Sequence, residues 1–276
     1  MGAASKLRAA RQQEDGAEAI VGYPELWQMR LSMYPEKARW ALDYKRVPHI
    51  RHSLLPGPHA AQLMVRFGQK AMPILRHEGR VLKNSAEVLD YVEKAWPDPP
   101  LYPQDAALCE RALEIQKWFD EKIGPAVRRA CFHEWLPHTE YSARRIATGL
   151  SERQQKLYAW AFPITRMIMM LDMRINATSA EAGCALTRKA LDFVAENSRR
   201  TGYLVGDQFS IADLTAATIL MPTCLPPEYP VPFPRPLPSG WEHWLERWQG
   251  HVGCEYVRRI YREHRGTTAA MGGRRP

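Results

Sequence analysis

The 276-residue sequence predicts two domains: an α/β domain with the element order βαβαββα over residues 23–97, and an all-α domain over residues 107–265. The chain is longer than one average domain, which favours two compact units. Short apolar runs alternate with helical periodicity up to residue 96, whereas almost only helical periodicity follows. Between the two patterns stands Trp96-Pro97-Asp98-Pro99-Pro100, which a helix cannot cross because proline lacks the amide donor. Residues 98–106 are therefore the predicted linker.

The elements of the first domain are predicted from their local patterns. Runs of strand-forming residues bounded by turn residues predict strands, and apolar residues spaced three and four apart predict helices. In chain order these are a strand at 25–29, a helix at 34–45, a strand at 48–55, a helix at 58–67, a strand at 72–75, a strand at 81–82 after the turn 77–80, and a helix at 85–96.

The second domain is predicted to be helical almost throughout. Helical periodicity covers residues 105–134, 141–175 with breaks, 179–198, 210–220 and 240–265. Residues 222–238 contain eight of the 22 prolines, which predicts an extended surface loop. Residues 1–22 are expected to form a flexible extension and residues 266–276 a solvated basic tail.

Composition excludes several classes of protein. The formal charge of +8 is concentrated near the end of the chain, and no zinc-finger spacing or RNA-reading motif accompanies it, which argues against nucleic-acid binding. No apolar run reaches the roughly 18 residues that a membrane span needs. The cysteines form no C-x-x-C pair, which argues against a disulfide framework and a metal site and favours a reducing, cytoplasmic location. They are Cys109, Cys131, Cys184, Cys224 and Cys254.

A hydroxyl group stands between the first strand and the first helix, at Ser32. The amino terminus of a helix carries unpaired amides and a partial positive charge, so it stabilises an anion such as a thiolate. A nearby hydroxyl can donate one more hydrogen bond to that anion. The alternative is that Ser32 only caps the helix, as serine commonly does.

Two further features follow in the same domain. Pro73 directly precedes a short apolar strand, and a cis Met72-Pro73 bond would turn the backbone of Met72 outward, where an extended peptide could pair with it. Asn84 or Ser85 is expected to cap the helix at 85–96, whose first amides would bind a carboxylate. The alternatives are that Pro73 only begins a strand, in the usual trans form, and that Asn84 or Ser85 only caps the helix.

Ser32, Met72-Pro73 and Ser85, in this order, resemble the glutathione transferase family, whose first domain is thioredoxin-like. A further segment, Gly206-Asp207-Gln208-Phe209-Ser210-Ile211-Ala212-Asp213-Leu214, resembles the helix-capping signature of the family's second domain. Ser210 and Asp213 have the spacing of a reciprocal capping pair, so their expected role is structural. Asn84 departs from the family pattern, in which an acidic residue usually precedes the serine.

The resemblance implies glutathione as the co-substrate, no metal, and Ser32 as the group that activates the glutathione thiol. The implied glutathione-binding residues are Tyr34, Lys70, Met72, Pro73, Asn84 and Ser85. The second substrate is expected to be a small hydrophobic electrophile, in a pocket lined by Tyr34, Phe132 and Trp135. A packing role for Tyr34 is equally open. The resemblance also implies a cytoplasmic homodimer with a role in detoxification.

Two alternatives remain. The first is a non-catalytic member of the same fold, acting as a ligand carrier or an assembly module, which the asparagine at position 84 keeps open. The second is a glutathione-dependent peroxidase or lyase. Thiol-disulfide exchange is the least attractive chemistry, because position 32 carries no cysteine.

Overall fold

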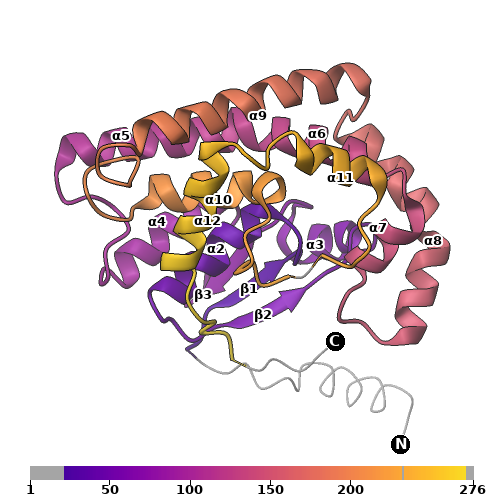
Figure 1. The fold of residues 1–276 in the computed structure, drawn as a ribbon. Helices are drawn as coiled ribbons and strands as arrows, with labels where there is room; N and C mark the ends of the chain where they lie inside the picture. Colours follow the sequence, from indigo (N-terminus) through magenta and orange to yellow (C-terminus); the bar gives the residue numbers. More distant parts are fainter. Residues whose placement is uncertain (1–21, 232, 272–276) are drawn as a thin grey trace, which may run out of the picture.

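A computed structural model describes residues 22–231 and 233–271 of the chain. The predicted N-terminal extension lies outside the described residues except for Gly22, as do residues 272–276 of the predicted tail. Within the described ranges the chain folds into the predicted α/β domain followed by a helical domain, shown in Figure 1.

The first domain is built on a mixed four-stranded sheet of order β2-β1-β3-β4. β1 runs parallel to β2, with Glu25 opposite Ile50, whereas β3 runs antiparallel to both β1 and β4. The strands are β1 (Glu25–Gln28), β2 (Ile50–Ser53), β3 (Ile74–His77) and β4 (Arg80–Leu82). The predicted order βαβαββα is confirmed.

Three helices complete this domain: α2 (Met33–Tyr44), α3 (His59–Phe67) and α4 (Ser85–Ala95). α2 and α4 pack against each other. α2 also packs on α10 (Ile211–Cys224) of the helical domain, so one face of α2 belongs to the contact between the domains. Trp40 and Leu42 of α2 are fully buried in a core that extends through both domains.

The helical domain packs through α10 on the side of α2 that faces away from the sheet (Figure 1). The predicted helix 105–134 is one helical stretch with a single π-type turn, Phe119–Ile123, between α5 (Ala106–Trp118) and α6 (Gly124–Trp135). The other helices are α7 (Thr139–Ile146), α8 (Glu152–Asp172), α9 (Ala177–Asn197), α11 (Ser239–Glu246) and α12 (Val252–His264). No helix among the described residues is both long and apolar enough to cross a membrane.

The predicted capping pair at the start of α10 is present. The Ser210 hydroxyl accepts a hydrogen bond from the Ala212 amide at 3.3 Å, and the Asp213 carboxylate accepts one from the Ser210 amide at 3.0 Å. Asp213 is fully buried and also accepts from the Leu204 amide at 2.9 Å and the Tyr256 hydroxyl at 2.7 Å. The pair therefore joins α10 to α12 as well as capping α10.

The proline-rich segment is less exposed than predicted. Its first residues, including Pro222, still belong to α10, and Tyr229, Val231 and Leu237 are buried. The prediction of a surface loop was wrong for these positions. After the end of α10 at Cys224 the prolines prevent regular secondary structure, but the apolar side chains between them pack into the core.

The C-terminal segment is also not simply a solvated tail. The Met271 amide donates to the His49 carbonyl at 2.9 Å, and His49 and Ala270 form an isolated parallel β-bridge. The Asp43 carboxylate accepts from the Ala269 amide at 2.9 Å. Asp43 is buried, and the segment 266–271 supplies part of the hydrogen bonding that a buried carboxylate requires.

Candidate active site

The three features predicted to form the site lie at one edge of the sheet. β1 and β3 are antiparallel, with Trp27 opposite Ile74, so the end of β1 lies beside the start of β3. β4 is antiparallel to β3, with Leu82 opposite Leu75, so the end of β4 lies at the same edge. The turn that contains Ser32, the Met72-Pro73 pair, and the start of α4 are therefore neighbours in space.

Ser32 is the N-cap residue of α2 and has extended backbone angles, φ −81° and ψ 135°. Its carbonyl accepts from the Glu36 amide at 3.1 Å, as the first turn of a helix requires. Its hydroxyl makes no capping hydrogen bond and has no other hydrogen-bond partner among the described residues. The alternative that this hydroxyl serves only to cap the helix therefore has no support in the geometry.

A buried arginine holds the turn before Ser32. Arg39 lies in the second turn of α2. It donates to the Arg30 carbonyl at 2.9 Å and to the Gln28 side-chain oxygen at 2.7 Å. The Tyr229 hydroxyl donates to the same Arg30 carbonyl at 3.2 Å. The turn is thus fixed from both domains, which restricts where the Ser32 hydroxyl can lie.

The charge of Arg39 belongs to a buried network that reaches the end of α12. Glu36 accepts from Arg39 Nε and from Arg265 Nε, each at 2.7 Å. Arg265 also pairs with Asp43 at 3.0 Å, and Arg51 pairs with the same carboxylate at 2.8 Å. Burial would raise the pKa of Asp43, but Arg51 and Arg265 bring it below its usual value. This network was not predicted from the sequence, because its members are far apart in the chain.

The segment before β3 is tied to the start of α4 by one side chain. The Met72-Pro73 peptide bond is cis. Gln69 donates through its amide nitrogen to the Ala71 carbonyl at 3.0 Å and to the Lys83 carbonyl at 2.8 Å. Gln69 therefore sets the spacing between two of the predicted glutathione-binding segments, a role that its position in the motif did not reveal.

Asn84 is the cap of α4. Its side chain accepts from the Glu87 amide at 2.9 Å and donates to the Glu87 carboxylate at 2.6 Å. Glu87 also accepts from the Lys83 amide at 2.9 Å. The Asn-x-x-Glu spacing, typical of a capping box, was a sequence signal for this role of Glu87. Ser85 is the first residue of α4 and is buried.

Two predicted glutathione-binding side chains have partners within the protein. Lys70 pairs with Asp172 of α8 at 2.6 Å, and both side chains are more than half exposed. The Tyr34 hydroxyl donates to the Asp120 carbonyl at 2.8 Å. Burial, opposed by Arg128, raises the pKa of Tyr34 to about 12, so the phenol is neutral at physiological pH. Tyr34 thus packs between the domains, which was the other role open to it.

The predicted second-substrate residues do not form one open pocket. Phe132 is partly buried and packs edge-to-face on Trp135. Trp135 is only 2% exposed and lies in the core of the helical domain, against Trp241. Trp135 therefore does not line an accessible pocket, and this prediction was wrong. The reason is that its neighbours, α7 and α11, pack over it, which local periodicity did not show.

α8 forms the outer rim of the candidate site, along both ends of α3. The Tyr158 hydroxyl donates to the Pro56 carbonyl at 3.2 Å, in the loop before α3. Thr165 lies against Gly57 in the same loop, and Asp172 pairs with Lys70 in the loop after α3. A helix was predicted in this part of the chain, but no role at the site was predicted for it.

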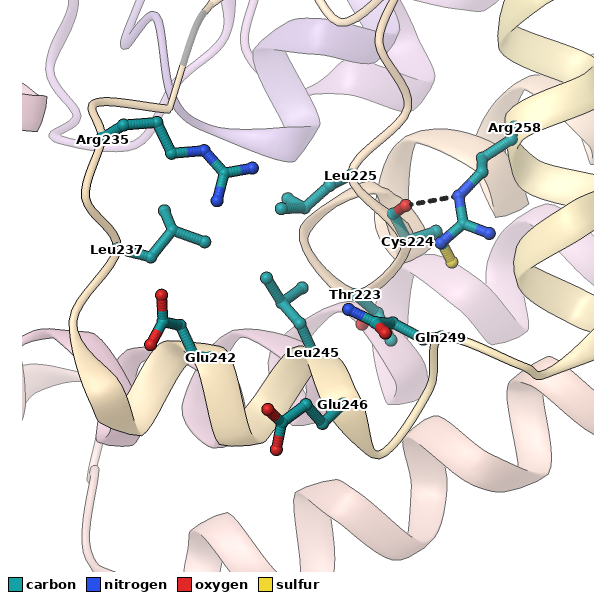
Figure 2. A pocket seen from close by; sticks show the side chains of 10 residues that line it. All are labelled: Thr223, Cys224, Leu225, Arg235, Leu237, Glu242, Leu245, Glu246, Gln249 and Arg258. Atoms are coloured by element: carbon teal, nitrogen blue, oxygen red, sulfur yellow. Dashed lines mark hydrogen bonds between the residues drawn. The ribbon is translucent and has the colours of Figure 1, made fainter.

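A separate cavity of about 330 Å³ lies at the end of α10, between the proline-rich segment and α11 (Figure 2). It is lined by Arg235, Leu237 and Glu242 on one side and by Leu225 and Arg258 on the other, and includes none of the predicted site residues. Among residues 22–231 and 233–271, no group of three or more His, Cys, Asp and Glu side chains could hold a metal ion.

Family models match both domains of the chain. A model of the glutathione S-transferase N-terminal domain matches residues 26–100, and a model of the glutathione S-transferase C-terminal domain matches residues 140–234.

Curated relatives match over shorter stretches. Glutathione S-transferase U8 of Arabidopsis thaliana is 35% identical over 112 residues, which are 40% of this chain and 49% of the relative. Glutathione S-transferase U4 of the same plant is 36% identical over 56 residues, 20% of this chain and 25% of the relative. The chain thus spans a quarter to a half of the length of these relatives.

Solved structures match the overall fold at low sequence identity. FzlA from C. crescentus has a TM-score of 0.54 at 17% identity, with 85% of this chain and 91% of that chain covered. A glutathione S-transferase from Rhodospirillum rubrum has a TM-score of 0.53 at 19% identity, with the same coverage. The beta-etherase LigF from a Sphingobium strain has a TM-score of 0.54 at 17% identity, covering 85% and 98% of the two chains.

Proposed function

Because the chain belongs to the glutathione S-transferase family, we propose that it transfers the glutathione thiolate to a small hydrophobic electrophile, with Ser32 as the activating residue. The observation that carries the proposal is the Ser32 hydroxyl, which stands at the amino terminus of α2 and has no partner among the described residues. A hydroxyl in this place donates a hydrogen bond to a sulfur anion that the helix terminus also stabilises.

The magnitude of the effect follows from the thiol pKa. A free thiol has a pKa of about 8.5, and lowering it by roughly two units makes the thiolate dominant at neutral pH. This shift corresponds to about 2.7 kcal/mol of preferential stabilisation of the thiolate. One charge-assisted hydrogen bond together with the helix terminus supplies an energy of this order.

The remaining roles follow from the shared edge of the sheet. The Met72 backbone, beside Pro73, pairs with the cysteinyl part of glutathione. The amides at the start of α4, near Asn84 and Ser85, hold its γ-glutamyl carboxylate. Lys70 reaches a glutathione carboxylate only by exchanging its partner Asp172, which costs little because exposed ion pairs contribute about 0–1 kcal/mol. We further propose a cytoplasmic homodimer with a role in detoxification.

A non-catalytic carrier is the second candidate, and one observation favours it. Both polar ends of the Asn84 side chain are engaged with Glu87, so this residue is not free to bind the amino group of glutathione as an acidic residue in its place would. Weak glutathione binding without turnover is the expected behaviour of such a protein. A glutathione-dependent peroxidase or lyase would use the same thiolate.

The test compares conjugation of glutathione to an aryl halide and to an isothiocyanate in the wild type and in Ser32→Ala. Ser239→Ala, an exposed serine at the start of α11, is the matched control. Loss of turnover in Ser32→Ala alone, with glutathione binding retained by calorimetry, supports the transferase. Binding without turnover in the wild type supports the carrier, and absence of both refutes the proposal.

A further inference from the structure

The outer face of α8 carries large apolar side chains that no other part of the described chain covers. Six of them are between 55% and 81% exposed. They are Leu157, Trp160, Ile164, Met167, Ile168 and Leu171, and together they are called the apolar face of α8. In Figure 1, α8 stands at the edge of the molecule, with α7 on its inner side. Single exposed apolar residues are normal, but a contiguous patch marks a surface that binds a protein or a membrane.

The apolar face runs along the length of α8. Five of its residues are separated by three, four, three and four positions, so they form one line along the helix, and Ile168 lies beside that line. The opposite side of α8, with Tyr158, Phe162 and Thr165, is buried against the rest of the chain. A helix of 21 residues is about 31 Å long. The face is thus additional to the packing that holds α8 in place, and it can lie along a flat surface.

Basic side chains stand at both ends of the apolar face. Arg153 lies one turn before Leu157 on the same side of α8, and Lys156 borders the face. Arg174 follows two positions after the last residue of the helix. All three basic residues are exposed. An apolar strip with cations at both ends is complementary to a phospholipid surface, in which anionic phosphates overlie an apolar interior.

The acidic side chains of α8 do not oppose this contact. Glu152 and Asp172 are exposed, but they lie about 100° around the helix from the centre of the apolar face. Asp172 also pairs with Lys70 of its own chain. Pairing of the face with a second copy in antiparallel register would bring Arg153 of one copy towards Arg174 of the other, so charge favours a lipid surface over a second copy.

Trp160 is the most exposed residue of the apolar face. It is 81% exposed, whereas the other eight tryptophans of the sequence are buried or partly buried in the described chain. An indole ring has an apolar body and one polar N–H group, and tryptophan is enriched at the level of lipid headgroups for this reason. The position of Trp160 in the middle of the first half of α8 is therefore suited to a membrane surface.

We propose that α8 binds the protein to the anionic surface of a phospholipid bilayer and lies in the plane of that surface. The apolar face enters the boundary between headgroups and acyl chains to a depth of about 5–10 Å. Arg153, Lys156 and Arg174 reach the lipid phosphates, with their aliphatic stems along the apolar layer. Because the inner side of α8 is already packed on its own chain, binding requires no folding of the helix.

Docking through α8 places the candidate active site beside the membrane. α8 contacts the loops on both sides of α3, through Tyr158 to the Pro56 carbonyl and through Asp172 to Lys70. A hydrophobic electrophile concentrates in lipid, so the site takes its second substrate at the membrane surface. This consequence rests on the proposed function, whereas the membrane contact does not and is measured without turnover.

The first test is sedimentation of the full chain with vesicles of phosphatidylcholine and phosphatidylserine in equal amounts, compared with vesicles of phosphatidylcholine alone. We expect binding to the anionic vesicles and at least about tenfold weaker binding without phosphatidylserine. Trp160→Asp is expected to weaken binding to the anionic vesicles at least about tenfold. Val252→Asp, at an exposed apolar position of α12, makes the same change of charge away from the face and is expected to bind like the wild type. A wild type that stays off the anionic vesicles overturns the proposal, as does equal weakening by the two variants.

A second test locates the contact on α8. Phospholipids with brominated acyl chains quench the fluorescence of tryptophans that reach the acyl region. Trp160→Phe keeps an apolar ring, so we expect it to bind the vesicles with much less quenching than the wild type. Equal quenching in both proteins would place the contact elsewhere and refute the role of α8. An oligomer that Ile164→Asp dissociates in analytical ultracentrifugation, together with no vesicle binding by the wild type, would assign the face to a second copy and also refute the proposal.

Discussion

The buried imidazole of His49 is expected to make the stability of the protein depend on pH. Its Nδ1 atom lies 2.8 Å from the Val47 carbonyl, and its Nε2 atom lies 2.9 Å from the Arg51 Nε–H group. The first contact needs a proton on Nδ1 and the second needs a bare Nε2, so the ring is neutral. A second proton would face the Arg51 guanidinium. Burial, reinforced by Arg51, lowers the pKa of His49 from 6.5 to about 4.

The sign follows from proton binding in the two states. Unfolded His49 takes up a proton near pH 6.5, whereas folded His49 does so only near pH 4. The folded state is therefore favoured above pH 6.5 and loses this advantage as the pH falls towards 4. Between pH 7.5 and pH 4.5 the loss amounts to roughly 2–3 kcal/mol of unfolding free energy.

The measurement is urea unfolding at these two pH values for the wild type and for His49→Gln, which keeps a donor and an acceptor but does not titrate. The wild type is expected to lose roughly 2–3 kcal/mol more than the variant between the two pH values. Equal losses in both proteins would refute the assignment of a neutral, buried imidazole. The variant corrects for other groups that titrate in this range.

Three further predictions concern charged side chains. Asp213→Ala is expected to lower the unfolding free energy by at least about 3 kcal/mol in chemical denaturation, because it leaves several buried donors without an acceptor; a loss under about 1 kcal/mol would contradict this. Arg265→Met is expected to cost about 3–5 kcal/mol, since it leaves the buried carboxylates of Glu36 and Asp43 short of a cation, and an unchanged melting temperature would speak against the network. Lys70→Ala is expected to weaken glutathione binding in calorimetry. Asp172→Ala is expected to leave that binding unchanged or to tighten it, because it frees Lys70 from its ion pair. Equal weakening in both variants would show that the ion pair, and not Lys70 alone, serves the site.

Local sequence patterns predicted the elements of the fold well, because side-chain periodicity shows which face of each element packs into the core, and caps show where a helix begins. The strand–turn–helix at Glu25 to Tyr44 and the capping pair of Ser210 and Asp213 are formed as expected. The edge of the sheet that unites Ser32, Met72-Pro73 and Ser85 follows from the spatial strand order β2-β1-β3-β4 and the antiparallel register of β3, neither of which was predicted from the sequence.

The contacts that tune the site could not be predicted from local patterns. The Tyr34 hydroxyl is oriented by its hydrogen bond to the carbonyl of Asp120, which lies 86 residues away in the chain. Arg265 pairs with Glu36 over 229 residues. A one-dimensional pattern does not encode which distant charge a buried guanidinium meets, so Arg265 was predicted only as the last residue of the helix 240–265, with no partner. The burial of Trp135 was also not predicted, because the side chains that cover it, Arg145 of α7 and Trp241 of α11, lie in other helices of the chain.

The central claim is that Ser32 stabilises the thiolate of bound glutathione, and the pKa of that thiol tests it most directly. The ultraviolet absorbance of the thiolate is followed against pH for glutathione bound to the wild type and to Ser32→Ala, with saturation checked by calorimetry. We expect a thiol pKa about two units below 8.5 in the wild type and one close to 8.5 in the variant. The same thiol pKa in both proteins would contradict the role of Ser32.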